Sequence, residues 1–231
     1  MLRKTALAVG ETYHVYNRGA HKQSIFTSEG DYQRFLLLLH LCNQLGPLDF
    51  RRLLSKYKGR SFADIFEEEK NEQSLVEILA YSLMPNHFHV VLRQKDEGGI
   101  TTFLKKVLTG YSMYFNTKYA HSGVLFQGRF KSSHIDNEAY FRYIFSYVHL
   151  NPLDLFAPGW KECGLKNPDG ARQYVNSYKY SSFFDYVGNN RAEKALLSFG
   201  QTPEFLKSQN DLEELLKVFT KDRPLYGLGI V

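Results

Sequence analysis

The feature that most constrains the fold is the segment Tyr81–Leu92, which reads YSLMPNHFHVVL. Its Met84–Asn86 tripeptide is typical of a tight turn between two apolar runs, so the segment predicts a β-hairpin. Side chains alternate along a strand, which places His87 and His89 on one face and Phe88 on the other. Two imidazoles roughly 6–7 Å apart on one face can bind one metal ion. The pattern is short, however, and by itself it favours an ordinary strand with two half-exposed histidines.

Periodicity and turn chemistry predict the other elements. These are a strand over 12–17, a helix from 28 to about 44, hairpin strands over 75–83 and 86–93, a helix over 101–118 that Thr101 caps, a strand over 124–131 and a helix over 137–149. Residues 48–73 are interpreted as an inserted segment, whose basic run either contacts DNA or forms a solvated face. Helical patterns continue in residues 186–231, where packing or partner binding is expected.

The predicted strand 124–131 alternates apolar and polar residues. One of its faces carries Gln127, Arg129 and Lys131. Such a face cannot lie in a core unless its polar groups are paired. It is suited to contacts with phosphates or bases, and a solvent-exposed sheet face would show the same pattern.

The predicted helix 137–149 has two distinct sides. Phe141, Ile144, Phe145 and Val148 form its core side, and Tyr140, Tyr143, Tyr147 and Asn151 gather on a neighbouring side. Tyr147 and Asn151 are four residues apart, so they stand one above the other. Pro152 ends the helix near Asn151. A tyrosine at such a boundary ordinarily has a buried ring and a hydrated hydroxyl.

Charge is unevenly distributed over the 231 residues, whose formal net charge is +5. Residues 1–60 carry ten Lys/Arg against four Asp/Glu, and residues 101–150 carry six against two. Basic segments rich in Tyr and Phe suit a nucleic-acid partner, although a solvated basic face has the same balance. The 43% apolar content excludes a disordered chain. Two cysteines without a Cys-x-x-Cys motif, no signal peptide and no membrane-length apolar run lead us to expect a cytoplasmic protein without a membrane partner.

Four segments occur in an order that points to a known family. They read YHVYNRG over 13–19, LMPNHFH over 83–89, GVLFQGRF over 123–130 and YVHLNP over 147–152. Together they resemble the single-tyrosine HUH transposases of small insertion sequences, and more closely their REP-associated tyrosine transposase branch. The resemblance covers roughly residues 10–155. Two positions depart from the family pattern: Asp154 stands where a basic residue is usual, and Tyr180 stands where a tryptophan is usual.

The resemblance implies an α+β fold, in which a ferredoxin-like antiparallel sheet (βαββαβ) is followed by a catalytic helix. The order of elements predicted above agrees with this fold. We therefore expect a catalytic domain over residues 1–155, with 48–73 inserted, and a mostly helical C-terminal extension over 156–231.

The resemblance also implies an activity on single-stranded, hairpin-forming DNA. Tyr147 would form a covalent 5′-phosphotyrosine, so that cleavage and rejoining use one site. His87, His89 and Asn151 would hold Mg²⁺ or Mn²⁺, although two imidazoles alone would also accept zinc or nickel. Tyr143 is the rival nucleophile one turn earlier, and register with Asn151 favours Tyr147. The DNA-binding residues are predicted to be Asn17, Arg18, Gln127, Arg129 and Lys131.

Two other functions remain open from the sequence. A metal-dependent hydrolase would use His87 and His89 with a water nucleophile, and would need His134 or Asp136 as a further ligand. A domesticated, non-catalytic protein would bind DNA hairpins without forming a covalent adduct. The resemblance leaves monomer and homodimer open, and it implies association with the bacterial nucleoid when the protein is bound to DNA.

Overall fold

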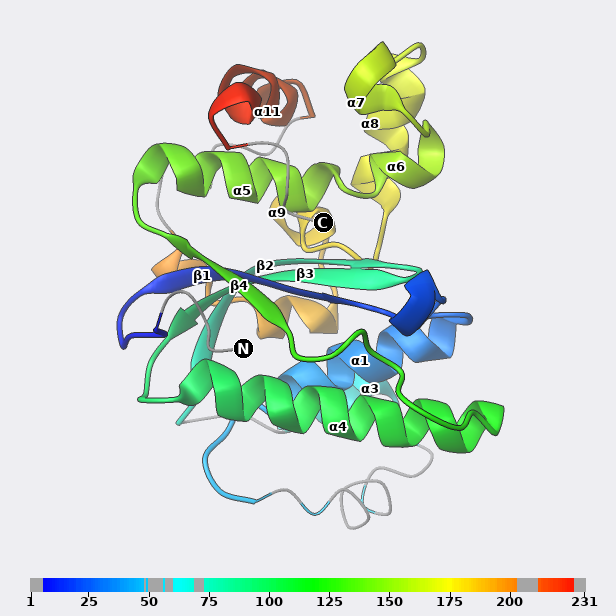
Figure 1. Ribbon diagram of the computed structural model, residues 1–231, viewed down its shortest axis with the longest axis vertical. Helices are drawn as coiled ribbons and strands as arrows, with labels where there is room; N and C mark the ends of the chain where they lie inside the picture. Colours follow the sequence, from blue (N-terminus) through cyan, green and yellow to red (C-terminus); the bar gives the residue numbers. More distant parts are fainter. Residues whose placement is uncertain are drawn as a thin grey trace.

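A four-stranded antiparallel sheet lies at the centre of the protein (Figure 1). The computed structural model describes residues 6–47, 49, 56, 60–68, 73–202 and 212–226. The strands are β1 (Thr12–Arg18), β2 (Val76–Met84), β3 (His87–Gln94) and β4 (Lys131–Ile135), in the spatial order β2-β3-β1-β4. With helices after β1 and β3, this is the ferredoxin-like arrangement. The predicted α+β fold class is therefore confirmed.

One face of the sheet is covered by α1 (Glu29–Leu41) and α4 (Gly99–Tyr119), with the short α3 (Phe62–Glu68) beside them (Figure 1). We call this the α1/α4 face. A capping box starts α1, because Ser28 and Asp31 satisfy each other's backbone N–H groups. The prediction that Thr101 caps α4 is wrong. The helix starts after Gly98, whose left-handed φ of 69° suits a residue without a side chain.

The opposite face is covered by α5 (Glu138–Leu150) and is called the α5 face (Figure 1). Asn137 caps the helix, since its side-chain oxygen accepts a hydrogen bond from the Tyr140 N–H. The predicted core residues Phe141, Ile144, Phe145 and Val148 are all buried. The helix ends at Leu150 with Asn151 as its C-cap. This packing fixes which side chains of α5 point toward the strands.

The predicted strand over 124–131 is wrong. Leu125 and Phe126 are both buried whereas Val124 is 76% exposed, so the side chains do not alternate. Gly123 and Gly128 adopt φ values of 102° and 113°, which bend the segment out of an extended conformation. The strand β4 begins only at Lys131. Alternating residue types resembled a strand here because glycine geometry is not part of the hydrophobic pattern.

The C-terminal part folds back onto the sheet. Its helices are α6 (Leu153–Phe156), α7 (Trp160–Cys163), α8 (Pro168–Ser177), α9 (Phe183–Tyr186), η2 (Ala192–Leu196), η3 (Phe199–Gln201) and α11 (Leu212–Tyr226), while η1 (Ala20–Lys22) lies near the N-terminus. Backbone N–H groups of Ser182 and Ser198 donate to carbonyls of β2, each over 2.9 Å. Arg191 pairs with the buried Asp185 and donates to the Tyr81 hydroxyl. The predicted boundary at residue 155 stays a prediction.

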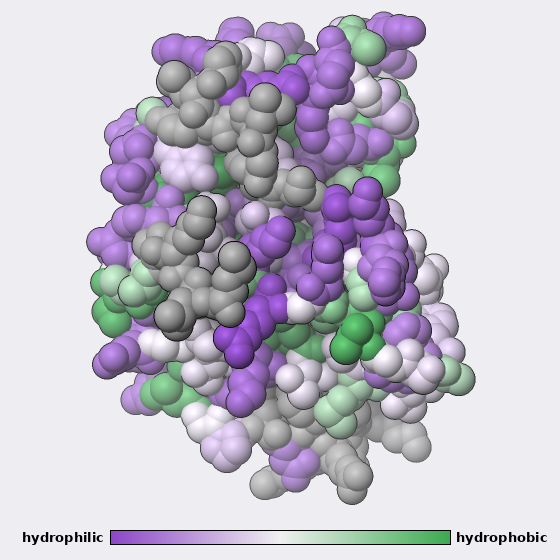
Figure 2. Space-filling view, viewed as in Figure 1, coloured by the Kyte–Doolittle hydropathy of each residue, from purple (hydrophilic) through white to green (hydrophobic). Residues whose placement is uncertain are grey.

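The surface of the protein is largely polar on the side shown in Figure 2. Hydrophilic residues cover most of the coloured area, and apolar residues occur there in small separate groups. No helix within the described ranges is both long and apolar enough to cross a membrane. Most of the predicted insert 48–73, with much of its basic run, lies outside the described residues.

Candidate active site

His87 and His89 lie on the α5 face of the central strand β3. Their ring centroids are 5.0 Å apart and the rings are nearly perpendicular. His89 is fully buried, whereas His87, next to the hairpin turn, is half-buried. The alternation predicted from the sequence thus brings both imidazoles to one place.

Hydrogen bonding defines the protonation of His87. Its Nδ1 lies 2.6 Å from Oδ1 of Asn86, and since a carbonyl oxygen only accepts, Nδ1 carries the proton. Burial lowers the pKa of His87 to about 4, so the ring is neutral at pH 7 and its Nε2 carries a lone pair instead of a proton. That atom lies 3.5 Å from Oδ1 of Asn151, whose amide nitrogen donates to the Tyr147 carbonyl. Two acceptors therefore face each other.

His89 has a different environment. Its Nδ1 lies 2.8 Å from Nε2 of His14, a fully buried histidine on the neighbouring strand β1. Its Nε2 is buried and has no hydrogen-bond partner among the residues that the structure describes. Burial lowers the pKa of His89 well below its usual value, and the nearby His14 lowers it further. A neutral imidazole with an unused nitrogen therefore lies beside His87.

Tyr147 projects from α5 onto this histidine cluster. The centroid of its ring lies 5.3 Å from that of His89 and 6.0 Å from that of His14. Burial raises the pKa of Tyr147, because its side chain is only 8% exposed. The rival Tyr143 stacks on Tyr147 and on Phe219 of α11 instead. Of the two tyrosines, Tyr147 is the one that packs against His89.

The predicted DNA-binding residues gather next to the histidines. They form a cavity of about 120 Å³ that we call the basic groove, lined by Tyr16, Asn17, Arg18, His87, His89, Gln127, Arg129 and Lys131. Gln127, Arg129 and Lys131 are exposed, although the first two belong to the glycine-bent segment and not to a strand. A phosphate chain could thus lie against cations while it approaches the histidine pair.

Asn17 contributes to the groove mainly through the protein's own backbone. Its amide nitrogen donates to the Gly128 carbonyl over 3.0 Å, and its oxygen accepts from the Arg18 N–H over 2.9 Å. The side chain is 5% exposed. These bonds attach the bent segment to β1 and so position Gln127 and Arg129.

Three residues of the site were not predicted from the sequence. His14 and Tyr16 alternate along β1 on the same face as the histidine pair, a signal that becomes visible only once β1 is known to pair with β3. Lys161 of α7 binds Asp154 over 2.7 Å and lies 5.7 Å above the Tyr147 ring. A cation therefore approaches Tyr147 from another helix, while position 154 itself is acidic.

The residues that a metal-dependent hydrolase would need as metal ligands do not lie together. His134 pairs with Tyr13 across the sheet, so it lies on the α1/α4 face, and its Nε2 is 2.7 Å from Glu11. Asp136 accepts a hydrogen bond from Asn137. Within the described part of the chain, no group of three or more His, Cys, Asp or Glu side chains is arranged around a metal position. The available set is two imidazoles and one amide.

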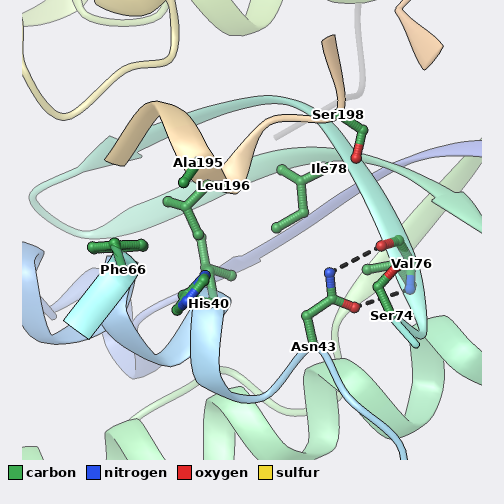
Figure 3. Close-up of a pocket in the computed structure, with 10 residues that line it drawn as sticks. His40, Asn43, Phe66, Ser74, Val76, Ile78, Ala195, Leu196 and Ser198 are labelled. Atoms are coloured by element: carbon green, nitrogen blue, oxygen red, sulfur yellow. Dashed lines mark hydrogen bonds between the residues drawn. The ribbon is translucent and has the colours of Figure 1, made fainter. Parts of the chain in front are cut away.

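A second, larger cavity of about 300 Å³ lies between α1, α3, β2 and η2 (Figure 3). Asn43 there exchanges two hydrogen bonds with the Val76 backbone, at 2.9 and 3.0 Å. The residues that line it include no Asp, Glu, Lys or Arg. We therefore take the basic groove and the adjoining histidines as the candidate site.

Residues 49–151 match the family model described as "Transposase IS200 like", a range that includes His87, His89, Tyr147 and Asn151. This match supports the single-tyrosine HUH transposase family that the four motifs predicted.

Two solved structures are similar to the chain at low sequence identity. One is a REP-associated tyrosine transposase bound to a REP hairpin, with 14% identity and a TM-score of 0.47 over 84% of this chain and 89% of that one. The other is tRNA(His) guanylyltransferase from Saccharomyces cerevisiae, with 11% identity and a TM-score of 0.34 over 87% and 84%. No curated protein matches the sequence.

Proposed function

We propose that this protein cleaves and rejoins single-stranded, hairpin-forming DNA through a covalent 5′-phosphotyrosine on Tyr147, as a transposase of the REP-associated type. The observation that carries the proposal is the packing of the Tyr147 ring against His89, 5.3 Å away, beside the Asn151–His87 contact of 3.5 Å. This arrangement supports the proposal because it brings Tyr147 beside two imidazoles that burial keeps neutral.

The same residues fit a divalent ion. His87 Nε2 and Asn151 Oδ1 are acceptors that face each other at 3.5 Å, and His89 Nε2 is a buried nitrogen without a partner among the described residues. Adjacent ligands of an octahedral Mg²⁺ or Mn²⁺ ion lie roughly 3 Å apart, close to that spacing. When bound, the ion would polarise a phosphoryl oxygen of the scissile phosphate.

The nucleophilic step balances without any further reagent. The Tyr147 oxygen bonds to phosphorus, the bond from phosphorus to the 3′-oxygen breaks, and the tyrosine proton passes to that departing oxygen, which becomes the 3′-hydroxyl. Because the phosphotyrosine retains the energy of that bond, the 3′-hydroxyl of another strand can reverse the step. Burial keeps the Tyr147 hydroxyl protonated at neutral pH, and Lys161 supplies positive charge above its ring as the proton leaves.

The basic groove would hold the strand that leads to the scissile bond. Arg18, Arg129 and Lys131 would contact phosphates, and Gln127 would contact a base or phosphate. Asn17 would act indirectly, through its hydrogen bond to the Gly128 carbonyl.

A covalent-capture assay tests the proposal. End-labelled single-stranded hairpins from the genomic flanks of the gene are incubated with Mn²⁺ or with chelator and resolved on denaturing gels. We expect a metal-dependent adduct that retains a 3′ label and releases a 5′-labelled fragment. The adduct should disappear in Tyr147→Phe and persist in Tyr143→Phe. An adduct that survives in Tyr147→Phe and is lost in Tyr143→Phe would overturn the assignment.

A non-catalytic hairpin-binding protein is the second candidate. The observation that favours it is the cover over Tyr147, which is 8% exposed beneath Phe219 and Lys161. Tight binding of several flank hairpins in the presence of Mn²⁺, with no adduct at any time, would support this function.

A further inference from the structure

The buried contact between His14 and His89 indicates what orients the His89 imidazole. His14 Nε2 lies 2.8 Å from His89 Nδ1, and both side chains are fully buried. The rings of His14 and His89 are stacked with centroids 5.0 Å apart, and Tyr16 packs against both, its centroid 5.1 Å from that of His14 and 5.8 Å from that of His89. Three aromatic rings from adjacent strands therefore fix the orientation of the His89 imidazole.

A packing role alone does not explain a histidine at this position. The other face of β1 carries Tyr13 and Val15, which belong to the apolar core with α1 and α4. An aliphatic side chain of similar size could fill the His14 site, which is bordered by the rings of Tyr16, His89 and Tyr147. The hydrogen bond between the two imidazoles is what a histidine adds.

That hydrogen bond can run in either direction, and its direction decides which nitrogen of His89 carries the proton. At 2.8 Å the contact holds one proton, which is carried either by His14 Nε2 or by His89 Nδ1. If His14 Nε2 donates, His89 must carry no proton at Nδ1 and one at Nε2. If His89 Nδ1 donates, the lone pair of His89 lies at Nε2 and the proton of His14 lies at Nδ1, and both of these atoms are buried without a partner among the described residues.

We propose that His14 is a positioning residue that accepts a hydrogen bond from His89 Nδ1 and thereby keeps the lone pair of His89 on Nε2, next to the His87 ring. The inference rests on the proposed function, in which that lone pair binds a divalent ion. Partners that orient a ligating imidazole in this way commonly change metal affinity by 10–100-fold when they are removed.

The test compares His14→Gln with His14→Leu. Glutamine retains an acceptor oxygen at the end of its side chain, whereas leucine retains comparable volume without an acceptor. The first readout is the ¹⁵N NMR tautomer of His89 in the metal-free protein. We expect the Nδ1–H tautomer in wild type and in His14→Gln, and a shift toward the Nε2–H tautomer in His14→Leu.

The second readout is the affinity for Mn²⁺ alone, measured by calorimetry or electron paramagnetic resonance. We expect a loss of about 10–100-fold in His14→Leu and a much smaller loss in His14→Gln. Wild-type tautomer and affinity in a folded His14→Leu would overturn the inference. If His14→Leu does not fold, the wild-type tautomer decides, because an Nε2–H proton on His89 in the wild type would also overturn it.

The two hypotheses fail in different ways. If His14→Leu loses Mn²⁺ affinity while wild type forms no adduct with any flank hairpin, the positioning role stands and the proposed transposition chemistry fails. If wild type forms the adduct and His14→Leu retains both its tautomer and its Mn²⁺ affinity, the chemistry stands and His14 only packs.

Discussion

At the scale of single residues, the site is built from histidines that burial keeps neutral. Burial lowers the pKa of His14 to about 3 and that of His87 to about 4, and it lowers the pKa of His89 as well. At neutral pH, all three therefore offer one lone pair and one N–H each. The direction of every hydrogen bond among them then decides where a lone pair is available.

Burial of histidines also predicts that acid lowers the stability of the fold. His149, which is not part of the candidate site, allows this effect to be tested separately. His149 Nε2 lies 2.7 Å from the Ser182 hydroxyl, and burial lowers the pKa of this histidine to about 3. Between pH 6.5 and about 3 the unfolded chain binds a proton that the native state does not. The free energy of unfolding therefore rises with pH through this window, and falls by about 1.4 kcal/mol for each unit below 6.5.

Urea unfolding of wild type and His149→Gln at about pH 7 and about pH 5 checks this prediction. Glutamine can keep a hydrogen bond to Ser182 but does not titrate. The variant should lose roughly 2 kcal/mol less stability between the two pH values than wild type loses. An equal loss in both proteins would show that His149 is not held neutral by the fold.

Site residues that are close in sequence could be predicted to lie together, whereas residues that are distant in sequence could not. His87 with His89, and Tyr147 with Asn151, are linked by strand and helix spacing, so each pair was predicted. His14 and Lys161 join the site only through the pairing of β1 with β3 and the placement of α7. No local periodicity carries that information.

At the scale of elements, amphipathic periodicity predicted α1, α4 and α5, since each buries one face against the sheet, and a turn between two apolar runs predicted the hairpin. It failed for residues 124–131. There the glycine backbone decides the conformation, and Leu125 and Phe126 are buried in succession. This segment nevertheless places Gln127 and Arg129 at the basic groove, so its bend is part of the site.

A substitution of Gly128 tests the importance of that bend. Gly128 has φ 113° and accepts the hydrogen bond of Asn17, so an added side chain strains the backbone where it is attached to β1. Gly128→Ala should destabilise the fold by about 1–3 kcal/mol and weaken binding of single-stranded DNA.

Gly188→Ala is the matched control for Gly128→Ala. Gly188 has a comparable φ of 94° but lies after α9, away from the basic groove. It should lower thermal stability similarly without changing DNA affinity, measured by fluorescence anisotropy. Equal DNA affinity of the two variants would argue against a role for the bend in binding.

At the scale of the whole molecule, α5 lies on the sheet of its own chain and brings Tyr147 to the histidines of that chain. Ile144, Phe145 and Val148 are fully buried in this packing. Exchange of α5 between two copies would require that apolar face to be exposed first. We therefore expect catalysis in cis, whether the protein is a monomer or a homodimer.

Complementation distinguishes cis from trans catalysis. Tyr147→Phe and His89→Gln are mixed and tested for the covalent adduct with Mn²⁺, and each is also mixed with wild type as a control. A cis arrangement gives no adduct in the mixture of variants and retains it in both controls. Recovery of the adduct in the mixture would mean that Tyr147 reaches the histidines of a partner.

The distribution of charge over the molecule gives a further prediction, the salt dependence of DNA binding. Arg18, Arg129 and Lys131 lie together in the basic groove, although Arg18 is far from the other two in sequence. For single strands, each phosphate neutralised by a cation contributes about 0.7 to the slope of log affinity against log salt. If all three contact phosphates, replacing all three with glutamine should reduce the magnitude of that slope by about 2.

Two controls separate this groove from the general positive charge of the protein, which is +5. Lys105→Gln removes an exposed cation on α4, on the opposite face of the sheet, and should leave the slope unchanged. Gln127→Ala removes an uncharged side chain of the groove and should weaken binding by the same factor at every salt concentration.

A slope in the triple variant equal to that of wild type would place the DNA elsewhere on the surface. An equal change in Lys105→Gln and in each single groove variant would mean that only net charge attracts the DNA, because position on the molecule would then have no effect.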